Sequence, residues 1–370
     1  METRQSIVYF TDLRADVKRT LMDKLDCLLE RLGVDTLYRR GHIVAIKLHF
    51  GEKGNTSFIR PVFVRRIADR IKGTGARAFL TDTNTLYVGT RTDSVSHLET
   101  AITNGFDYAV TGAPIIIADG LRGESTEHVR VDGRHLKEVC IAREIASADG
   151  IVCLTHFKCH ELTGFGGALK NIGMGCAGRE GKLAQHSRCA PKVDPEGCTA
   201  CGECVASCPA DAIDMGAKAV IREGSCIGCG YCIAVCPEGT IKVQWDETTE
   251  ALQEKMVEHV KGALKDKEGM CVYINFLTQI SPACDCYGHT DAPVVPDIGI
   301  LASRDPVAID HASAALVNAE RGLKGSALTD GFEPGADKFR GVHPSIDWMV
   351  QLRYAERMGI GTLRYRLEEV

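Results

Sequence analysis

Short apolar runs alternate along the chain with longer segments whose apolar residues recur on one helical face. Runs of strand length lie at 43–49, 76–81, 115–118, 151–154, 270–276 and 298–302, and helical patterns lie at 58–72, 96–104 and 248–265. Asp305-Pro306 marks a further helix start, with a capping Asp and a first-turn Pro, and Gly105 marks a helix end. Continuous apolar strands that alternate with helices predict an α/β host domain with a largely parallel sheet.

This pattern is interrupted by two cysteine runs of one form. The spacing is Cys-x2-Cys-x2-Cys-x3-Cys-Pro in both, and each cysteine of the first run has a counterpart 28 positions later: Cys198, Cys201, Cys204 and Cys208 in the first run, and Cys226, Cys229, Cys232 and Cys236 in the second. An internal repeat of this kind indicates a two-cluster ferredoxin-like (α+β) domain with pseudo-twofold symmetry.

The spacing predicts two [4Fe–4S] clusters. Three thiolates two residues apart wrap three corners of one cluster, while the fourth cysteine of the run ligates the other cluster. Zinc ribbons also use Cys-x2-Cys pairs, but a third Cys at x2 and a Cys-Pro at x3 favour clusters. The expected ligand sets are a first set of Cys198, Cys201, Cys204 and Cys236, and a second set of Cys208, Cys226, Cys229 and Cys232.

The cysteine segment is expected to be an insertion. We predict a first part of the host domain at 1–190, the ferredoxin-like insertion at 191–243, and the second part of the host at 244–370. Seven acidic and four basic side chains give residues 191–243 a net charge of −3.

The composition indicates which partners and which cellular environment to expect for the protein. The chain has 370 residues and a net charge of −5, which does not indicate a nucleic-acid partner. No membrane span or export signal is visible, so a soluble cytoplasmic protein is expected. Its 17 cysteines favour metal ligation over disulfides and suit an anaerobic or strongly reducing cytoplasm. Cys27, Cys140, Cys153 and Cys271 lie in apolar runs and are expected to be small core residues.

Reactive side chains follow the predicted strands. Ligands of parallel sheets bind at the carboxyl ends of the strands, so we expect a polar pocket there. Residues 156–192 contain six Lys or Arg side chains and only two acidic ones, an excess of positive charge that favours an anionic ligand. The glycine-rich stretch 164–178 could offer backbone amides to such a ligand. The candidate acid–base or ligand residues are Lys47, His49, His156, Lys158, His160, Lys170 and His186.

Cys284-x-Cys286 is a further candidate. Two thiols so close together chelate a metal, contribute to a third cluster or form a redox dithiol; the alternative is a pair of reduced bystanders in a loop. The glycines at 164–167 do not match the G-x-G-x-x-G order of a dinucleotide site.

Four stretches carry a resemblance to a known family: Lys47-Leu-His-Phe-Gly-Glu, Phe79-Leu-Thr-Asp-Thr-Asn-Thr-Leu-Tyr, His156-Phe-Lys-Cys-His-Glu-Leu-Thr-Gly-Phe-Gly-Gly-Ala-Leu-Lys-Asn-Ile-Gly-Met-Gly and Asp297-Ile-Gly-Ile-Leu-Ala-Ser-Arg-Asp-Pro-Val-Ala-Ile-Asp. With them the chain resembles the domain-of-unknown-function 362 family, in the branch with an inserted ferredoxin. Cys159 stands where that motif more often has Gly, so its thiol is expected to be incidental. The resemblance implies an iron–sulfur protein and supplies no reaction.

These observations favour an oxidoreductase. Electrons from a redox partner protein, docked on the acidic insertion, would pass through the clusters to a small anionic substrate in the pocket. The alternatives are a non-catalytic electron carrier or accessory protein that uses the host domain for docking, and a cluster-based redox sensor. The oligomeric state, the cluster potentials and the substrate are left open by the sequence.

Overall fold

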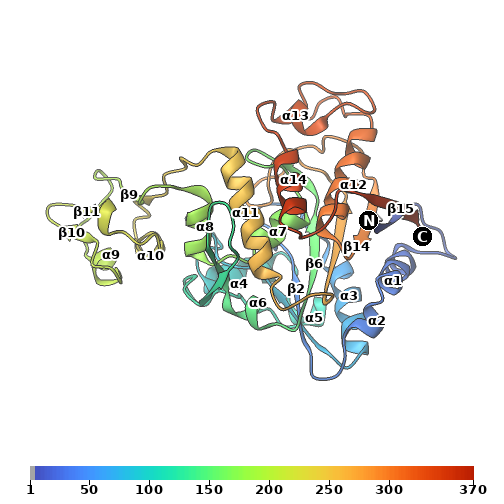
Figure 1. Ribbon diagram of the computed structural model, residues 1–370, viewed down its shortest axis with the longest axis horizontal. Helices are drawn as coiled ribbons and strands as arrows, with labels where there is room; N and C mark the ends of the chain where they lie inside the picture. Colours follow the sequence, from blue (N-terminus) through green and yellow to red (C-terminus); the bar gives the residue numbers. More distant parts are fainter. Residues whose placement is uncertain (1–4) are drawn as a thin grey trace.

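The computed structural model describes residues 5–370, and its host is built on one seven-stranded sheet (Figure 1). Every strand is parallel to the rest except β14, which is antiparallel to both neighbours, so the expected largely parallel sheet is confirmed. Its order is β15 (Tyr365–Glu369), β1 (Ser6–Asp12), β14 (Gly299–Ser303), β13 (Cys271–Leu277), β6 (Gly150–His156), β2 (Ile43–Lys47) and β3 (Arg77–Thr81).

Helices cover both faces of this sheet, because its central strands are apolar on both sides. On β6, Ile151 and Cys153 pack into one buried cluster, and Val152 and Leu154 pack into another on the opposite face. The first face is covered by α6 (Arg143–Ser147), α7 (Ala168–Gly173), α11 (Thr249–Ala263), α12 (Pro306–Ala319), α13 (Lys338–Val342) and α14 (Met349–Arg357). The second is covered by α1 (Leu21–Arg31), α2 (Val34–Leu37), α3 (Pro61–Gly73) and α4 (Ser94–Thr103), with α5 (Tyr108–Thr111) beside them.

Most predicted elements are present within a few residues of their expected bounds. Helix α12 begins as expected, because the Asp305 side chain accepts hydrogen bonds from the amides of Val307 and Ala308. Helix α4 ends before Gly105, which adopts a left-handed φ of 88°.

The predicted strand at 115–118 is wrong. This segment runs beside β3 but forms only the single bridge Leu80↔Ile115. Pro114, which precedes it, has no amide hydrogen to extend a ladder. Strands β1 and β15, and the hairpins formed by β4 (Thr126–Arg130) with β5 (Glu138–Ala142) and by β7 (Lys158–His160) with β8 (Gly164–Gly166), were not predicted.

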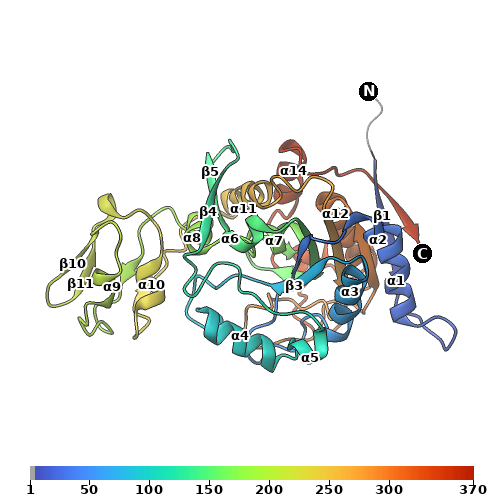
Figure 2. The same cartoon turned by 90° about the horizontal axis from the view of Figure 1, so that it is seen from below.

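A cysteine-rich lobe, residues 192–242, projects from one end of the host beyond α8 (Arg179–His186), as Figures 1 and 2 show. Strand β9 (Lys192–Val193) pairs with β12 (Ile241–Lys242), so the chain enters and leaves the lobe side by side. Between them lie α9 (Glu203–Ala206), β10 (Ile213–Met215), β11 (Ala219–Ile221), a 3-10 helix (Glu223–Ser225) and α10 (Tyr231–Val235).

The sequence repeat of the lobe is also a structural repeat. Gly202 and Gly230 occupy equivalent positions, both have a left-handed φ, and each immediately precedes a short helix that carries a cysteine. Outside the lobe as within it, no helix in residues 5–370 combines the length and apolarity needed to cross a bilayer.

Candidate functional site

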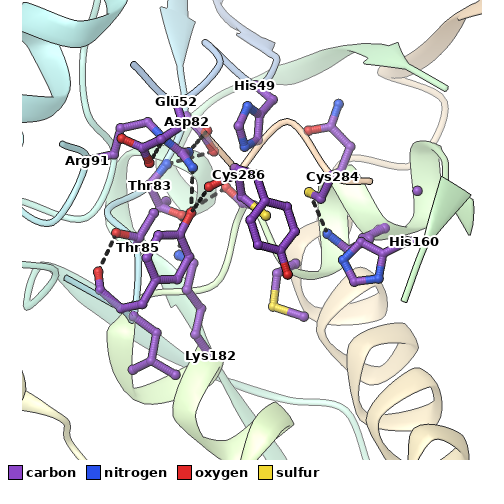
Figure 3. Close-up of a pocket in the computed structure, with 18 of the residues that line it drawn as sticks. His49, Glu52, Asp82, Thr83, Thr85, Arg91, His160, Lys182, Cys284 and Cys286 are labelled. Carbon is purple, nitrogen blue, oxygen red and sulfur yellow. Dashed lines mark hydrogen bonds and ion pairs between the residues drawn. The ribbon is translucent and has the colours of Figure 1, made fainter. Parts of the chain in front are cut away.

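One cavity of about 820 Å³ lies at the carboxyl ends of β2, β3, β6 and β13. This is where ligands of parallel sheets bind. It brings together all nine side chains expected from the sequence: Lys47, His49, His156, Lys158, His160, Lys170, His186, Cys284 and Cys286. Apolar side chains, among them Leu86, Trp245 and Leu252, form other parts of its wall. Figure 3 shows part of this lining.

A buried network of ion pairs holds one end of the cavity. The Lys47 ammonium lies 3.0 Å from Asp82 Oδ1 and donates to Asn171 Oδ1 at 2.7 Å. Arg91 lies 3.6 Å from Asp82 and donates from Nε to Glu52 Oε2 at 3.1 Å. Burial alone would raise the pKa of the Asp82 carboxyl, but Lys47 and the neighbouring cations hold it well below its ordinary value. These charges are therefore mutually compensated.

His49 lies just beyond the end of β2, beside this network. Its Nδ1 accepts a hydrogen bond from the Gly51 amide at 2.9 Å, so the proton of a neutral ring sits on Nε2. Burial, and then the nearby Arg91 charge, lower the pKa of His49 to about 3. The ring is therefore neutral near pH 7 and presents an N–H donor.

Asp285 binds two of the predicted residues. His156 Nδ1 lies 2.9 Å from Asp285 Oδ1, and Lys158 Nζ lies 2.9 Å from Asp285 Oδ2. His156 Nε2 lies 2.9 Å from the carbonyl oxygen of Thr278, so both ring nitrogens face oxygen acceptors. Burial opposes ionisation of Asp285, but His156 and Lys158 hold its pKa far below the ordinary value. This arrangement fixes the loop that carries Cys284 and Cys286.

The two thiols form a polarised pair. A hydrogen bond from Cys286, together with Lys170 and His160, holds the pKa of Cys284 well below 9.0 against the effect of burial. The same contact and burial raise the pKa of Cys286. Lys170 Nζ lies 3.8 Å from Cys284 Sγ, and Figure 3 shows His160 facing the same sulfur. Cys284 is therefore the thiolate of the pair and Cys286 the thiol.

Helix α8 contributes Lys182, a group that can bind and release a proton. Burial lowers the pKa of Lys182 to about 8, although Asp119 and Asp82 oppose the shift. Lys182 Nζ donates to the carbonyl of Ala177 at 2.6 Å and to the Thr83 hydroxyl.

His186 lies one turn further along α8. Its Nδ1 donates to the carbonyl of Lys182 at 2.8 Å, and its ring packs edge-on against Trp245. Burial lowers the pKa of His186 to about 4, so the neutral ring leaves Nε2 as an acceptor.

Two backbone amides of the glycine-rich stretch, which was expected to offer amides to an anionic ligand, have another role. The amides of Ala168 and Leu169 donate to the buried Asp310 carboxylate, at 2.7 and 2.9 Å. A Cβ on Gly167 would lie only 2.4 Å from Asp310 Oδ1, so glycine permits this approach. These two amides are thus committed to Asp310, which joins α7 to α12.

In the cysteine-rich lobe, the eight cysteines line two small cavities. Cys198, Cys201, Cys204 and Cys236 line one, and Cys208, Cys226, Cys229 and Cys232 line the other. Each cavity therefore takes three cysteines from one run and the fourth from the other run. Backbone amides lie near two sulfurs: the Ala212 amide is 3.2 Å from Cys208 Sγ, and the Thr240 amide is 3.4 Å from Cys236 Sγ. Such donors suit metal-bound thiolates.

Seven further cysteines lie outside the lobe and the Cys284–Cys286 pair, and one of them, Cys189, is exposed. Cys153, Cys159, Cys176 and Cys271 belong to the hydrophobic core, and burial raises the pKa of Cys159 to about 12. Cys140 is equally buried but lies outside every apolar cluster of the described residues, and Cys27 is only half-buried. The expectation of a core position thus fits Cys140, Cys153 and Cys271, although Cys140 lies outside the apolar clusters, and it fails for Cys27.

The lobe and the cavity share a wall. Leu86 and Leu183 of the host belong to the same apolar cluster as Ile213, Ile233 and Ile241 of the lobe. Leu86 also lines the cavity. A Cβ built on Gly230 would lie within 4 Å of Arg179 and Leu86.

Several residues that line the cavity are not among the candidates predicted from the sequence. Asp82 and Lys182 stand in segments that follow predicted strands, so strand-end position was an available signal. Glu52, Arg91 and Asp285 lie in loops, where no periodic pattern marks them.

This protein therefore combines a mostly parallel α/β domain, which has a polar cavity at its strand ends, with a cysteine-rich lobe. The chain belongs to the DUF362 family, described as a domain of unknown function, whose family model matches residues 44–315.

Two solved structures resemble parts of the chain. The lactate racemase apoprotein from Thermoanaerobacterium thermosaccharolyticum is 16% identical, with a TM-score of 0.38, over 74% of this chain and 51% of its own. A protein from Thermotoga maritima is 11% identical, with a TM-score of 0.36, over 70% of this chain and 50% of its own. The chain thus spans about half the length of each. No curated protein matches it.

Proposed function

We propose that this protein is an iron–sulfur oxidoreductase, in which an inserted ferredoxin-like domain at 191–243 serves the cavity of the host. The observation that carries the proposal is the composition of the two lobe cavities, each lined by three cysteines of one run and the fourth of the other. This is the ligand exchange expected of a protein with two [4Fe–4S] clusters. When bound, such clusters supply one-electron transfer.

The contact between lobe and host supports a route for electrons into the cavity. Gly230 lies between two cysteines of the second set, and a Cβ built on it would lie 3.8 Å from Leu86 Cδ1. Leu86 lines the cavity on its other side. The second set therefore lies next to the host, and the first set also approaches it, because a Cβ on Gly239, which follows Cys236, would lie 3.5 Å from Val88 Cγ2. The lobe's net charge of −3, from seven acidic and four basic side chains, favours a redox partner with a basic docking face.

The cations of the cavity that lack a carboxylate partner favour an anionic ligand. Among the described residues, Lys47 and Arg91 pair with Asp82, and Lys158 pairs with Asp285, whereas Lys170 and Lys182 have no carboxylate within salt-bridge distance. A carboxylate or phosphate would find these two ammonium groups available. Cys284 would lie beside the bound anion, because Lys170 Nζ is 3.8 Å from its sulfur.

Protons for a reduction would come from the chain's own groups. Lys182, with a pKa of about 8, gives up and takes back a proton near neutral pH. Cys286 retains its proton beside the Cys284 thiolate. The Cys284–Cys286 pair serves either as a redox dithiol or as ligands for an additional metal or cluster, and the metal count described next separates these roles.

The test begins with anaerobically purified protein. We expect about eight irons per chain and interacting one-electron paramagnetic signals after reduction. Stoichiometric zinc with almost no iron would overturn the proposal, and about four further irons, or one other metal that Cys284→Ser removes, would assign that metal to Cys284 and Cys286. Cys201→Ser and Cys229→Ser should each disturb one signal, whereas Cys27→Ser, outside the lobe, should disturb neither.

A second measurement separates an enzyme from an electron carrier or sensor. Reduced methyl viologen would supply electrons, and its oxidation would be followed with a panel of small carboxylates and phosphates. For an enzyme, at least one acceptor is turned over, and Lys170→Met lowers the rate by roughly 100-fold or more, as loss of a proton donor or charge clamp does, with iron content unchanged. Electron transfer only to other redox proteins, insensitive to Lys170→Met, would assign the carrier role.

A further inference from the structure

Three potential metal ligands lie together outside the cavity and outside the two cysteine sets. They are His128 on β4, Cys140 on β5 and Glu180 on α8, and their donor atoms all lie within 4.8 Å of one another. His128 and Cys140 are directly opposite each other in the β4–β5 ladder, so their side chains project from the same face. Figure 2 shows this hairpin standing beside α8, on the side of the host that faces the lobe.

The positions of these side chains come close to a coordination sphere. His128 Nε2 lies 3.6 Å from Glu180 Oε2, and Cys140 Sγ lies 3.9 Å from the same oxygen. Around a tetrahedral zinc ion with ordinary bond lengths, these separations would be about 3.3 Å and about 3.5 Å. These two separations are therefore within a few tenths of an ångström of that geometry, and the His128 and Cys140 donor atoms lie within 4.8 Å of each other.

The environment of Cys140 also differs from that of the cysteines that belong to the apolar clusters. Its neighbours Val139 and Ile141 pack into the hydrophobic core, whereas Cys140, on the opposite face of the strand, belongs to no apolar cluster of the described residues. The His128 and Glu180 side chains are 53% and 37% exposed, which leaves an ion a path from solvent to the buried sulfur.

We propose that His128, Cys140 and Glu180 form a mononuclear site for a zinc-class divalent cation, with a fourth position open to water. One thiolate, one imidazole and one carboxylate suit zinc, whereas magnesium and calcium prefer oxygen ligands alone. Binding releases the Cys140 proton to solvent and leaves the oxidation state of the metal unchanged. The site is independent of the proposed redox function.

A cation bound at this site would also connect two elements of the host. It ties the β4–β5 hairpin to the first turn of α8, where Arg179 meets Gly230 of the lobe. Glu180 is also close enough to act electrostatically on Cys229 and Tyr231. A bound cation would neutralise that carboxylate and stiffen the host surface on which the lobe rests.

The test uses the full iron-loaded chain, equilibrated anaerobically with one equivalent of zinc chloride per chain and then desalted. We expect one zinc per chain, and X-ray absorption at the zinc edge with one sulfur near 2.3 Å and lighter ligands at about 2.0–2.2 Å. Cys140→Ser, His128→Ala and Glu180→Gln should each weaken zinc binding by more than the roughly tenfold that loss of an outer-shell partner costs. Iron content should stay at the wild-type level in all three.

Two matched controls separate this site from general effects. Glu127→Gln alters the neighbouring exposed carboxylate on β4, and Cys27→Ser removes a half-buried thiol on α1; neither should change zinc binding. If Cys140→Ser fails to fold, the surface variants His128→Ala and Glu180→Gln decide the matter. Unchanged zinc binding in those two, or a spectrum with four sulfurs that places the ion in the lobe, would overturn the proposal.

Discussion

Cys284 combines burial with a stabilised thiolate, which are usually opposed. A buried thiol ordinarily resists ionisation, yet here the Cys286 hydrogen bond, Lys170 and His160 outweigh that cost. Cys189 is the reverse case: it is exposed, and Asp246 and Glu223 raise its pKa to about 11. The two cysteines should therefore differ in reactivity in the order opposite to their accessibility.

Alkylation by iodoacetamide checks this reversal. Between pH 6 and 8, Cys284 should react at a nearly constant rate, because its thiolate is already formed, whereas the rate at Cys189 should rise about tenfold per pH unit. Peptide mass spectrometry would follow both sites in one sample. Lys170→Met should slow Cys284 at pH 7 and leave Cys189 unchanged; equal pH dependence at the two cysteines would contradict the assignment.

Lys170 and Lys182 line the same cavity, but their pKa values are shifted in opposite directions. Burial opposes the charge on both, but the Cys284–Cys286 pair more than compensates at Lys170 and raises its pKa, whereas the pKa of Lys182 falls to about 8. An anion should therefore lose part of its attraction to Lys182 as the pH rises through 8, while Lys170 stays charged.

Competitive acetylation measures this difference directly. With trace acetic anhydride, labelling of Lys182 should show a midpoint near pH 8, because only the neutral amine reacts, and Lys170 should be labelled only at much higher pH. Quantitative mass spectrometry of the two peptides gives both curves. Coincident midpoints would show that the two environments do not differ as described.

At the scale of elements, the loop between β13 and β14 is held by one carboxylate. Asp285 is wholly buried and pairs with Lys158 on β7 and with the His156 ring on β6. Asp285→Asn keeps the shape but leaves the Lys158 ammonium without its counter-charge, so we expect a loss of about 3–5 kcal/mol in the free energy of unfolding. Anaerobic calorimetry should record a lower melting temperature.

Asp297→Asn is the matched control for this loss. Asp297 belongs to the same loop and accepts a hydrogen bond from the Gln279 amide, but it is exposed. Its replacement should change the free energy of unfolding by about 0.5 kcal/mol or less, as most surface substitutions do. A comparable loss in both variants would mean that the ion pairs of Asp285 contribute little.

The sequence predicts the elements of this cavity better than the contacts inside it. The nine candidate side chains could be found because parallel strands bring their carboxyl ends to one edge, and strand ends are visible as the last residues of apolar runs. Nothing local indicates that Asp285 reaches His156, which lies 129 positions earlier. Strands β1 and β15 were missed for a related reason, since each is completed by a partner at the other end of the chain.

At the scale of the whole molecule, the cysteine-rich lobe meets the host through a small contact that a methyl group can probe. Gly230 and Gly228 have nearly the same left-handed φ, 72° and 73°, so alanine introduces similar backbone strain at both. A Cβ on Gly230 would lie 3.2 Å from Arg179 Cγ, whereas one on Gly228 meets nothing within 4 Å. The difference between the two variants therefore isolates the contact.

Hydrogen–deuterium exchange would report on this comparison. Gly230→Ala should increase exchange in the first turn of α8 and around Leu86, because the lobe is pushed away from them, while Gly228→Ala should leave both segments as in the wild type. Both variants lose about 1–2 kcal/mol locally through the left-handed conformation. Identical exchange in α8 for the two variants would show that the lobe does not rest there.

The pairing of β9 with β12 has a consequence for the history of this chain. Val193 faces Ile241 across that ladder, so residues 194–240 leave and rejoin the host at a single point. No strand of the seven-stranded sheet lies between these positions. One genetic event could therefore add or remove the whole cysteine repeat as a single cassette, without changing the order of strands in the sheet.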